Sequence, residues 1–196
     1  TEAKRRTVAI LAGRGLISLS PGRNQAVLAE KDELTHRPTD EPKWRESYYF
    51  NWADLRNKVS GFSTIGLVPN EGRSEFVLAL FTGDQVDVHY HEPKLEKFTD
   101  DINSMLQDSK LSYKLIRPFK EWRISYASPK LKLELTFETR FSTFNFPPDS
   151  SGSWQHHFEA SGIISGRIRN KDGIITNVGG YGQRDKSWGH RDWFKF

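Results

Sequence analysis

The chain has 196 residues, no cysteine, 13% aromatic residues and a formal net charge of +4. The lack of cysteine excludes disulfides and thiolate metal sites. The mild basic excess is spread along the chain and does not predict nucleic-acid binding, and no apolar run approaches the roughly 20 residues that span a bilayer. The many rings exclude a disordered chain and are typical of a β-rich protein with an aromatic interior.

Residues 1–33 carry turn-forming and basic residues, and we expect them to form an irregular arm with one or two strands. The stretch VAILAGRGLISL within this arm is apolar in parts, but arginine interrupts it and no convincing small-residue cleavage site follows. We therefore interpret it as a strand or arm rather than as a signal peptide. The chain starts without methionine and stops at WFKF, which suggests a fragment of a longer protein.

Period-two alternation of side chains begins at residue 46 and predicts half-buried β-strands. In the first such segment, Glu46, Tyr48, Phe50 and Trp52 share one face. Similar segments follow at 61–84 with a turn at 69–72, at 84–92, at 131–141, and at 156–182 with a turn at 170–173. Only residues 94–109 have a mixed polar pattern that could form a short helix. The pattern as a whole predicts an all-β chain, an antiparallel sandwich or barrel.

Two pairs of histidines are candidates for chemistry. His89 and His91 lie two apart in a predicted strand and project on one face, where both could bind one metal ion. No third ligand follows at a characteristic spacing, so a solvated pair on an exposed face is favoured and no metal site is predicted. His156 and His157 point to opposite faces of a strand, and one of them could face an interior cavity, more often as a core residue than as a catalytic one.

The densest cluster of functional residue types is GGYGQRDKSWGHRDWF, residues 179–194. Four carboxylates of the chain are candidates for acid–base chemistry: Glu46, Glu159, Asp185 and Asp192. Asp185 is the best placed, because a carboxyl group against an indole in a dry pocket has a raised pKa and can deliver a proton at neutral pH. A contact with Arg184 would oppose this by holding the carboxylate ionised. On these residues alone, a structural ion pair is favoured over a catalytic acid.

Several segments together resemble a known superfamily: WRESYYFNWAD, GFSTIGLVPNEGR, RPFKEWRISY, HHFEASGIISGRI and GYGQRDKSWGHRDW. It is the lipocalin-related group that includes carotenoid hydratases (hydroxyneurosporene synthase), kievitone hydratase and fungal Diels–Alderases. The resemblance covers residues 34–196 and is strongest to an uncharacterised bacterial branch with an RDxSWGxRDW motif.

The resemblance implies two consecutive lipocalin-like β-domains around a pocket for an isoprenoid, polyene or polyketide. Residues 34–196 would form the first domain, and a second β-domain would be supplied in cis or in trans. It also implies protonation of an alkene without a cofactor or metal, followed by hydration, cyclisation or isomerisation. We expect a cytoplasmic protein, with or without peripheral membrane association. The alternatives are a non-enzymatic carrier of hydrophobic ligands with the same fold, and a scaffold domain whose motif only stabilises an interface.

Alignment on the aspartate and Trp-Gly that this family shares implies specific roles. Asp185 takes the position of the catalytic acid and His156 that of its upstream histidine helper. Phe158 replaces a tryptophan and Gln183 a tyrosine, so the substrate or the reaction could differ from carotenoid hydration. The implied substrate-binding residues are Phe158, Trp188, Tyr48, Trp52 and Gln183. The implied structural ion-pair residues at the domain junction are Arg184, Arg191 and Asp192.

Overall fold

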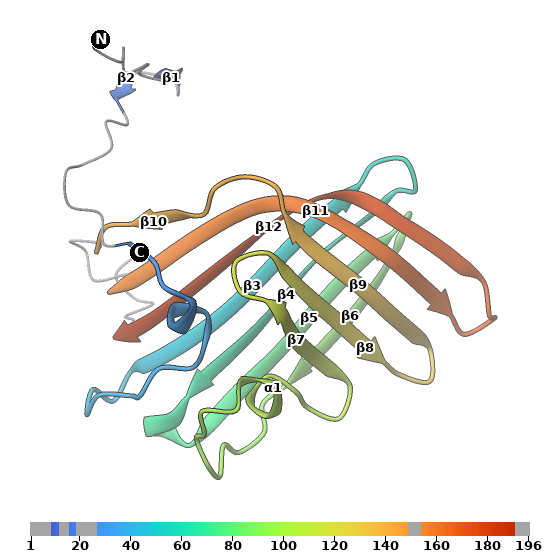
Figure 1. Ribbon diagram of the computed structural model, residues 1–196. Coiled ribbons are helices and arrows are strands. Elements are labelled where there is room, and N and C mark those ends of the chain that lie inside the picture. Colours follow the sequence, from blue (N-terminus) through green and yellow to red (C-terminus); the bar gives the residue numbers. More distant parts are fainter. Residues whose placement is uncertain (1–8, 12–15, 19–26, 149–153, 191–196) are drawn as a thin grey trace.

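The computed structural model describes residues 9–11, 16–18, 27–148 and 154–190 (Figure 1). Ten strands in these ranges form one antiparallel sheet: β3 (Trp44–Asp54), β4 (Val59–Val68), β5 (Arg73–Thr82), β6 (Gln85–His91), β7 (Leu111–Arg117), β8 (Glu121–Ala127), β9 (Leu131–Thr139), β10 (Phe144–Phe146), β11 (His156–Asn170) and β12 (Ile175–His190). The order is β6-β5-β4-β3-β12-β11-β9-β8-β7, with β10 paired to β11. β6 and β7 are thus the two edges of this path. A separate hairpin joins β1 (Ala9–Leu11) to β2 (Leu16–Ser18).

The alternation predicted from residue 46 onward is confirmed on β3. Glu46, Tyr48, Phe50 and Trp52 are all at most 3% exposed, so they share the inner face of the sheet. Both predicted turns are present as well. The 3-10 helix η2 (Pro69–Glu71) ends at Gly72 in a left-handed conformation, and the β11–β12 hairpin turns at residues 170–174.

The sheet curls so that its two halves face each other across one aromatic core (Figure 1). The ring of Phe50 on β3 packs edge-on against Tyr113, Trp122 and Phe137 of β7, β8 and β9, at centroid distances of 5.1 to 5.9 Å. Burial of such rings is the main favourable term in a fold of this size. The predicted all-β, lipocalin-like class is confirmed as a curled half-barrel.

Two glycines of the GGYG run allow β12 to lie close against β3. A Cβ on Gly180 would lie 2.1 Å from the carbonyl oxygen of Ala53, and one on Gly182 would lie 2.5 Å from that of Asn51. At Gly179, by contrast, a Cβ would meet nothing within 4 Å. Gly180 and Gly182 therefore serve the close packing of β12 against β3.

β6 departs from the sequence prediction. Its apolar residues Val86, Val88 and Tyr90 are 57 to 68% exposed, whereas His89 is only 8% exposed. The prediction of a solvated histidine pair is therefore wrong for His89. The reason is that the curl of the sheet turns the His89 face of this edge strand toward the opposite edge.

Besides η2, two short helices lie outside the sheet. The 3-10 helix η1 (Glu30–Glu33) precedes β3 and buries the side chain of Glu33 completely. The helix α1 (Ile102–Met105) is capped by Asp101, which accepts from the backbone N–H of Asn103. Of the two alternatives for residues 94–109, a short helix or a loop with one helical turn, the structure shows the second, since α1 has four residues. No helix in the described part of the chain has the length and apolar character needed to cross a membrane.

Candidate functional site

At one end of the concave face, buried charges replace the rings of the core. Four ionisable side chains are at most 2% exposed there: Glu33, Glu46, Arg184 and Lys186. Arg184 and Lys186 alternate with outward residues on β12, opposite Phe50 and Tyr48 of β3. Buried charges of this kind require partners, because desolvation of an unpaired ion costs several kcal/mol.

Arg184 pairs with Glu33 of η1. Its Nη1 lies 2.7 and 2.9 Å from the two carboxylate oxygens, and the backbone N–H of Phe119 donates to the same carboxylate at 3.0 Å. The guanidinium also lies 5.1 Å from the centre of the Phe158 ring and 5.3 Å from that of Trp122. This pair fastens η1 to the inner face of the sheet.

Lys186 forms the second buried ion pair. Its Nζ donates to Glu46 Oε1 at 2.6 Å and to the backbone carbonyls of Asp32 at 3.0 Å and Leu34 at 2.5 Å. Burial lowers the pKa of Lys186, and the neighbouring Glu46 opposes this shift. Burial, reinforced by Glu46, raises the pKa of the Tyr48 phenol, which therefore stays protonated.

His36 is held by the same glutamate. Glu46 accepts a hydrogen bond from the backbone N–H of His36 at 2.8 Å through Oε2 and lies 2.8 Å from His36 Nδ1 through Oε1. The other ring nitrogen, Nε2, is buried without a hydrogen-bond partner within the described ranges. Its nearest carboxylate oxygen is Oδ1 of Asp32, at 3.9 Å. Two contacts from one carboxylate fix both the position and the orientation of this imidazole.

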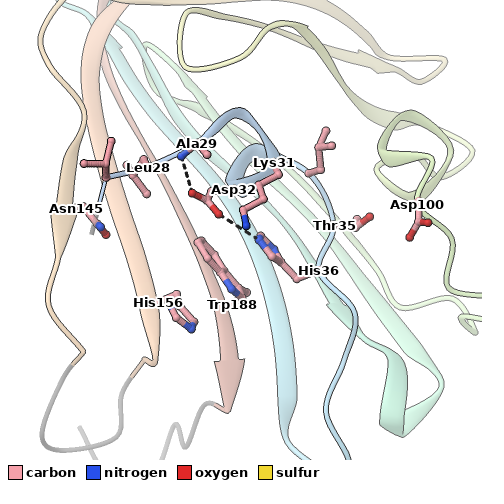
Figure 2. Close-up of a pocket in the computed structure, with 12 residues that line it drawn as sticks. Leu28, Ala29, Lys31, Asp32, Thr35, His36, Asp100, Asn145, His156 and Trp188 are labelled. Carbon is pink, nitrogen blue, oxygen red and sulfur yellow. Dashed lines mark hydrogen bonds and ion pairs between the residues drawn. The ribbon is translucent and has the colours of Figure 1, made fainter. Parts of the chain in front are cut away.

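Of these groups, His36 lines a pocket of about 800 Å³, which we call the Trp188 pocket. It is lined by Val27, Leu28, Ala29, Lys31, Asp32, Leu34, Thr35, His36, Asp100, Asn145, His156 and Trp188. Figure 2 shows Trp188 between His36 and His156. The three rings are stacked, with centroid distances of 4.0 Å to His36 and 4.8 Å to His156 and interplanar angles of 3° and 11°. The wall thus combines an aromatic surface with two imidazoles.

The two imidazoles of the stack differ in their surroundings. Partial burial lowers the pKa of His156, and the neighbouring His36 adds to this effect, while Asp32 opposes it. His156 is therefore neutral at physiological pH and can accept a proton. His36 instead has its Nδ1 against a buried carboxylate.

The residues predicted from the sequence do not all lie at the Trp188 pocket. Trp188 and His156 line the Trp188 pocket. Phe158, Tyr48 and Trp52 are buried on the inner face beneath or beyond it, and Arg184 is paired with Glu33 as described above. Arg191 and Asp192 lie outside the described residues.

Asp185 and Gln183 lie on the opposite side of β12 from the pocket. Asp185 is half-buried and has Tyr49 of β3 and Glu159 of β11 as its register neighbours, whereas Gln183 is exposed. Because neighbouring residues of a strand point to opposite faces, Asp185 faces away from Arg184 and Lys186, and also from Trp188, which lines the pocket. The catalytic role of Asp185 remains a prediction.

Two residues that line this pocket, Asp32 and His36, and the buried Lys186 that contacts His36 were not predicted from the sequence. The first belonged to the segment expected to be an irregular arm, and His36 lies just after it. Lys186 carried a usable signal, because it occupies the same face of β12 as Trp188. A lysine at an inward position of a strand indicates a buried ion pair.

The curled antiparallel sheet is a lipocalin-like fold, and a solved structure shares it. A crystal structure at 2.00 Å resolution of a protein assigned as AttH, from Nitrosomonas europaea, matches this chain with a TM-score of 0.60 at 12% sequence identity. The match covers 89% of this chain and 58% of that chain. The chain therefore spans less than two thirds of that protein, and at this identity the likeness concerns the fold alone.

The chain belongs to the family described as a domain of unknown function, DUF7064, whose model matches residues 29–196. A comparison with curated proteins finds no match. The shared fold agrees with the lipocalin-like fold that the sequence predicts. The matched range includes η1, which carries Glu33, the partner of Arg184.

Proposed function

We propose that the chain binds a hydrophobic small molecule of the isoprenoid, polyene or polyketide kind in the Trp188 pocket and transfers a proton to or from it without a redox cofactor. The reaction that follows is a hydration, a cyclisation or an isomerisation. The observation that supports this proposal most directly is the Glu46–His36 pair at the pocket wall.

A carboxylate that holds one nitrogen of an imidazole leaves the other nitrogen as an oriented proton donor or acceptor. Glu46 contacts both Nδ1 and the backbone N–H of His36, and Lys186 Nζ lies 3.3 Å from the same Nδ1, so rotation of the ring would break the contacts at Nδ1. Nε2 remains unpaired beside Asp32, which also lines the pocket. Because Nε2 is itself buried, His36 could exchange a proton with a substrate atom only where the bound ligand displaces the side chains that cover this nitrogen.

A second proton-transfer group is available at the far side of the stack. In a hydration, the proton added to the alkene would come from His36, and water would add to the resulting cation and lose a proton to neutral His156. The apolar side chains of Leu28 and Leu34 supply a surface for an isoprenoid chain.

Turnover separates the role of His36 from that of Asp185. Native mass spectrometry of protein purified from a cell extract first identifies the class of any retained apolar ligand. For that class, we expect His36→Gln to reduce turnover by about 10²–10⁴-fold, the usual contribution of a general acid or base, while the ligand still binds. If Asp185→Asn abolishes turnover and His36→Gln does not, the proton donor is Asp185 and the assignment to His36 is wrong.

A non-enzymatic carrier is the second candidate. It is favoured by the position of Asp185 outside the pocket and by the neutral His156, which is a poor acid for an alkene. A carrier predicts ligand retention without turnover in the wild type, and loss of retention in Trp188→Asp. A matched control is Tyr181→Asp, because Tyr181 is 77% exposed and does not line the pocket.

A further inference from the structure

A second cluster of chemically active side chains lies where the two edges of the sheet meet, away from the residues that line the Trp188 pocket. His89 and His91 come from the edge strand β6, and Asp108 comes from the turn that leads into the other edge strand, β7. His89 Nε2 and His91 Nδ1 each lie 2.9 Å from the same oxygen, Oδ2 of Asp108. The three ligand atoms all lie within 4.8 Å of one another.

The carboxylate of Asp108 is positioned by its own turn. Its Oδ1 accepts from the backbone N–H groups of Lys110 at 2.7 Å and Leu111 at 2.6 Å. This leaves Oδ2 to face the two imidazoles. Burial raises the pKa of Asp108, but these backbone hydrogen bonds and the two histidines outweigh it and lower the pKa overall, so the group is ionised at neutral pH.

We propose that His89, His91 and Asp108 bind one Zn²⁺ ion, or a divalent ion of similar preference, across the seam between β6 and β7. Two imidazole nitrogens and one carboxylate oxygen are a donor set that zinc and its neighbours in the first transition series favour. His91 is 46% exposed at its side chain, so the ion can enter from solvent and complete its coordination with water.

Admitting the ion requires the three ligand atoms, now within 4.8 Å of one another, to become evenly spaced. With metal–ligand distances of about 2.0–2.2 Å, a tetrahedral site places its nitrogen and oxygen ligands about 3.3 Å apart. Each N···O separation would therefore widen by a few tenths of an ångström. The proton on each ligating nitrogen would move to the other nitrogen of its ring through solvent, so the imidazoles stay neutral.

The ion would join the two edges of the half-barrel. In the sheet order, β6 and β7 are at opposite ends of the path. A metal bonded to two residues of β6 and to Asp108, just before β7, would link these two ends of the sheet. Binding energy that depends on the folded arrangement adds to the stability of the fold. This site is independent of the proposed function of the Trp188 pocket.

Cobalt titration tests the site directly. Protein treated with EDTA and freed of chelator is titrated with Co²⁺, whose visible bands report coordination, and Zn²⁺ is then added in competition. We expect one Co²⁺ per chain, displaced by Zn²⁺. We expect His91→Ala or Asp108→Asn to weaken binding by more than about 100-fold, since even partners of metal ligands contribute 10–100-fold.

A matched control is His157→Gln. His157 lies on β11 and its Nε2 is 3.1 Å from Oε1 of Glu159, so this change also removes a histidine that contacts a carboxylate. The variant should bind Co²⁺ like the wild type. Thermal unfolding gives a second readout: Zn²⁺ should raise the Tm of the wild type and of His157→Gln, but not that of His91→Ala. The proposal is overturned if the wild type binds no more Co²⁺ than His91→Ala, or if Zn²⁺ raises the Tm of both equally.

Discussion

The middle and the end of the concave face are built from the same two strands but from opposite chemistry. In the middle, Phe50 of β3 packs against rings from β7, β8 and β9. Toward the end, Glu46 on β3 and Lys186 on β12 are buried as ions, and the buried Arg184, directly opposite Phe50, stands at the boundary. Every second residue of β3 and β12 points inward in both regions, whether it carries a ring or a charge. The burial of a position on these strands therefore does not determine its polarity.

The difference shows how each region fixes its neighbours. Apolar rings accept many arrangements of similar volume, so the core specifies the fold through shape. The charged end needs particular partners, because both Glu33 and the carbonyl groups that Lys186 contacts come from residues 32–34. The buried ions therefore determine where the segment before β3 lies, and with it the wall of the Trp188 pocket.

The largest effect should come from Lys186→Met, which leaves Glu46 buried without its cation. We expect a loss of about 3–5 kcal/mol in the free energy of unfolding, measured by urea denaturation. This equals the loss expected for Phe50→Ala in the apolar middle, about 3–5 kcal/mol. The control Lys132→Met, at an exposed position of β9, should change stability by less than about 0.5 kcal/mol.

The two regions should then differ in how they are rescued. Adding Glu46→Gln to Lys186→Met removes the unpaired charge, so the double variant should be more stable than the sum of the two single changes predicts. No such recovery is expected for Phe50→Ala, whose cost is a cavity. A Lys186→Met protein as stable as the wild type would show that Glu46 tolerates the loss of its cation, and that the buried ion pair does not contribute to stability.

A smaller effect is expected where β12 lies closest to β3. In Gly180→Ala the new methyl group meets the backbone carbonyl of Ala53, which cannot rotate away. Such overpacking costs about 1–3 kcal/mol. Gly179→Ala is the matched control, since its methyl group enters open space. Equal stabilities of the two variants in urea would mean that β12 can shift freely along β3.

The sheet itself could be predicted from the sequence because strand periodicity is local. The alternation at Tyr48, Phe50 and Trp52 and the turn at Gly72 each depend on residues within one hairpin. The same rule also limits the candidate site. On a strand, Asp185 must face away from Lys186 and Trp188, so their closeness in sequence does not make them one site.

The partners of the buried groups could not be predicted, because they lie far away along the chain. Glu33 meets Arg184 across 151 residues, and Glu46 meets Lys186 across 140. Asp108 reaches His89 only because the sheet curls until its edges meet. Contacts of this kind follow from the tertiary fold, and no local pattern in one sequence indicates them.

The smallest effect concerns the outer face of the same sheet, where Glu75 on β5 pairs with Arg45, 2.7 Å away, and with Arg73. Burial raises the pKa of Glu75, but the two arginines outweigh it and lower the pKa overall. A folded-state pKa below the unfolded value gives stability that is present above the unfolded pKa of about 4.3 and is lost as the pH falls.

The fall in the free energy of unfolding at acid pH should therefore depend on Glu75. We expect Glu75→Gln to remove on the order of 1 kcal/mol at pH 7 and to flatten the loss of stability as the pH falls below about 5. Glu134→Gln is the control, because its pair with Arg167 is more than half exposed on both sides and contributes little. If both variants lose stability at low pH as the wild type does, the pH dependence comes from other carboxylates. The ion pairs of Glu75 on the outer face then contribute nothing to it.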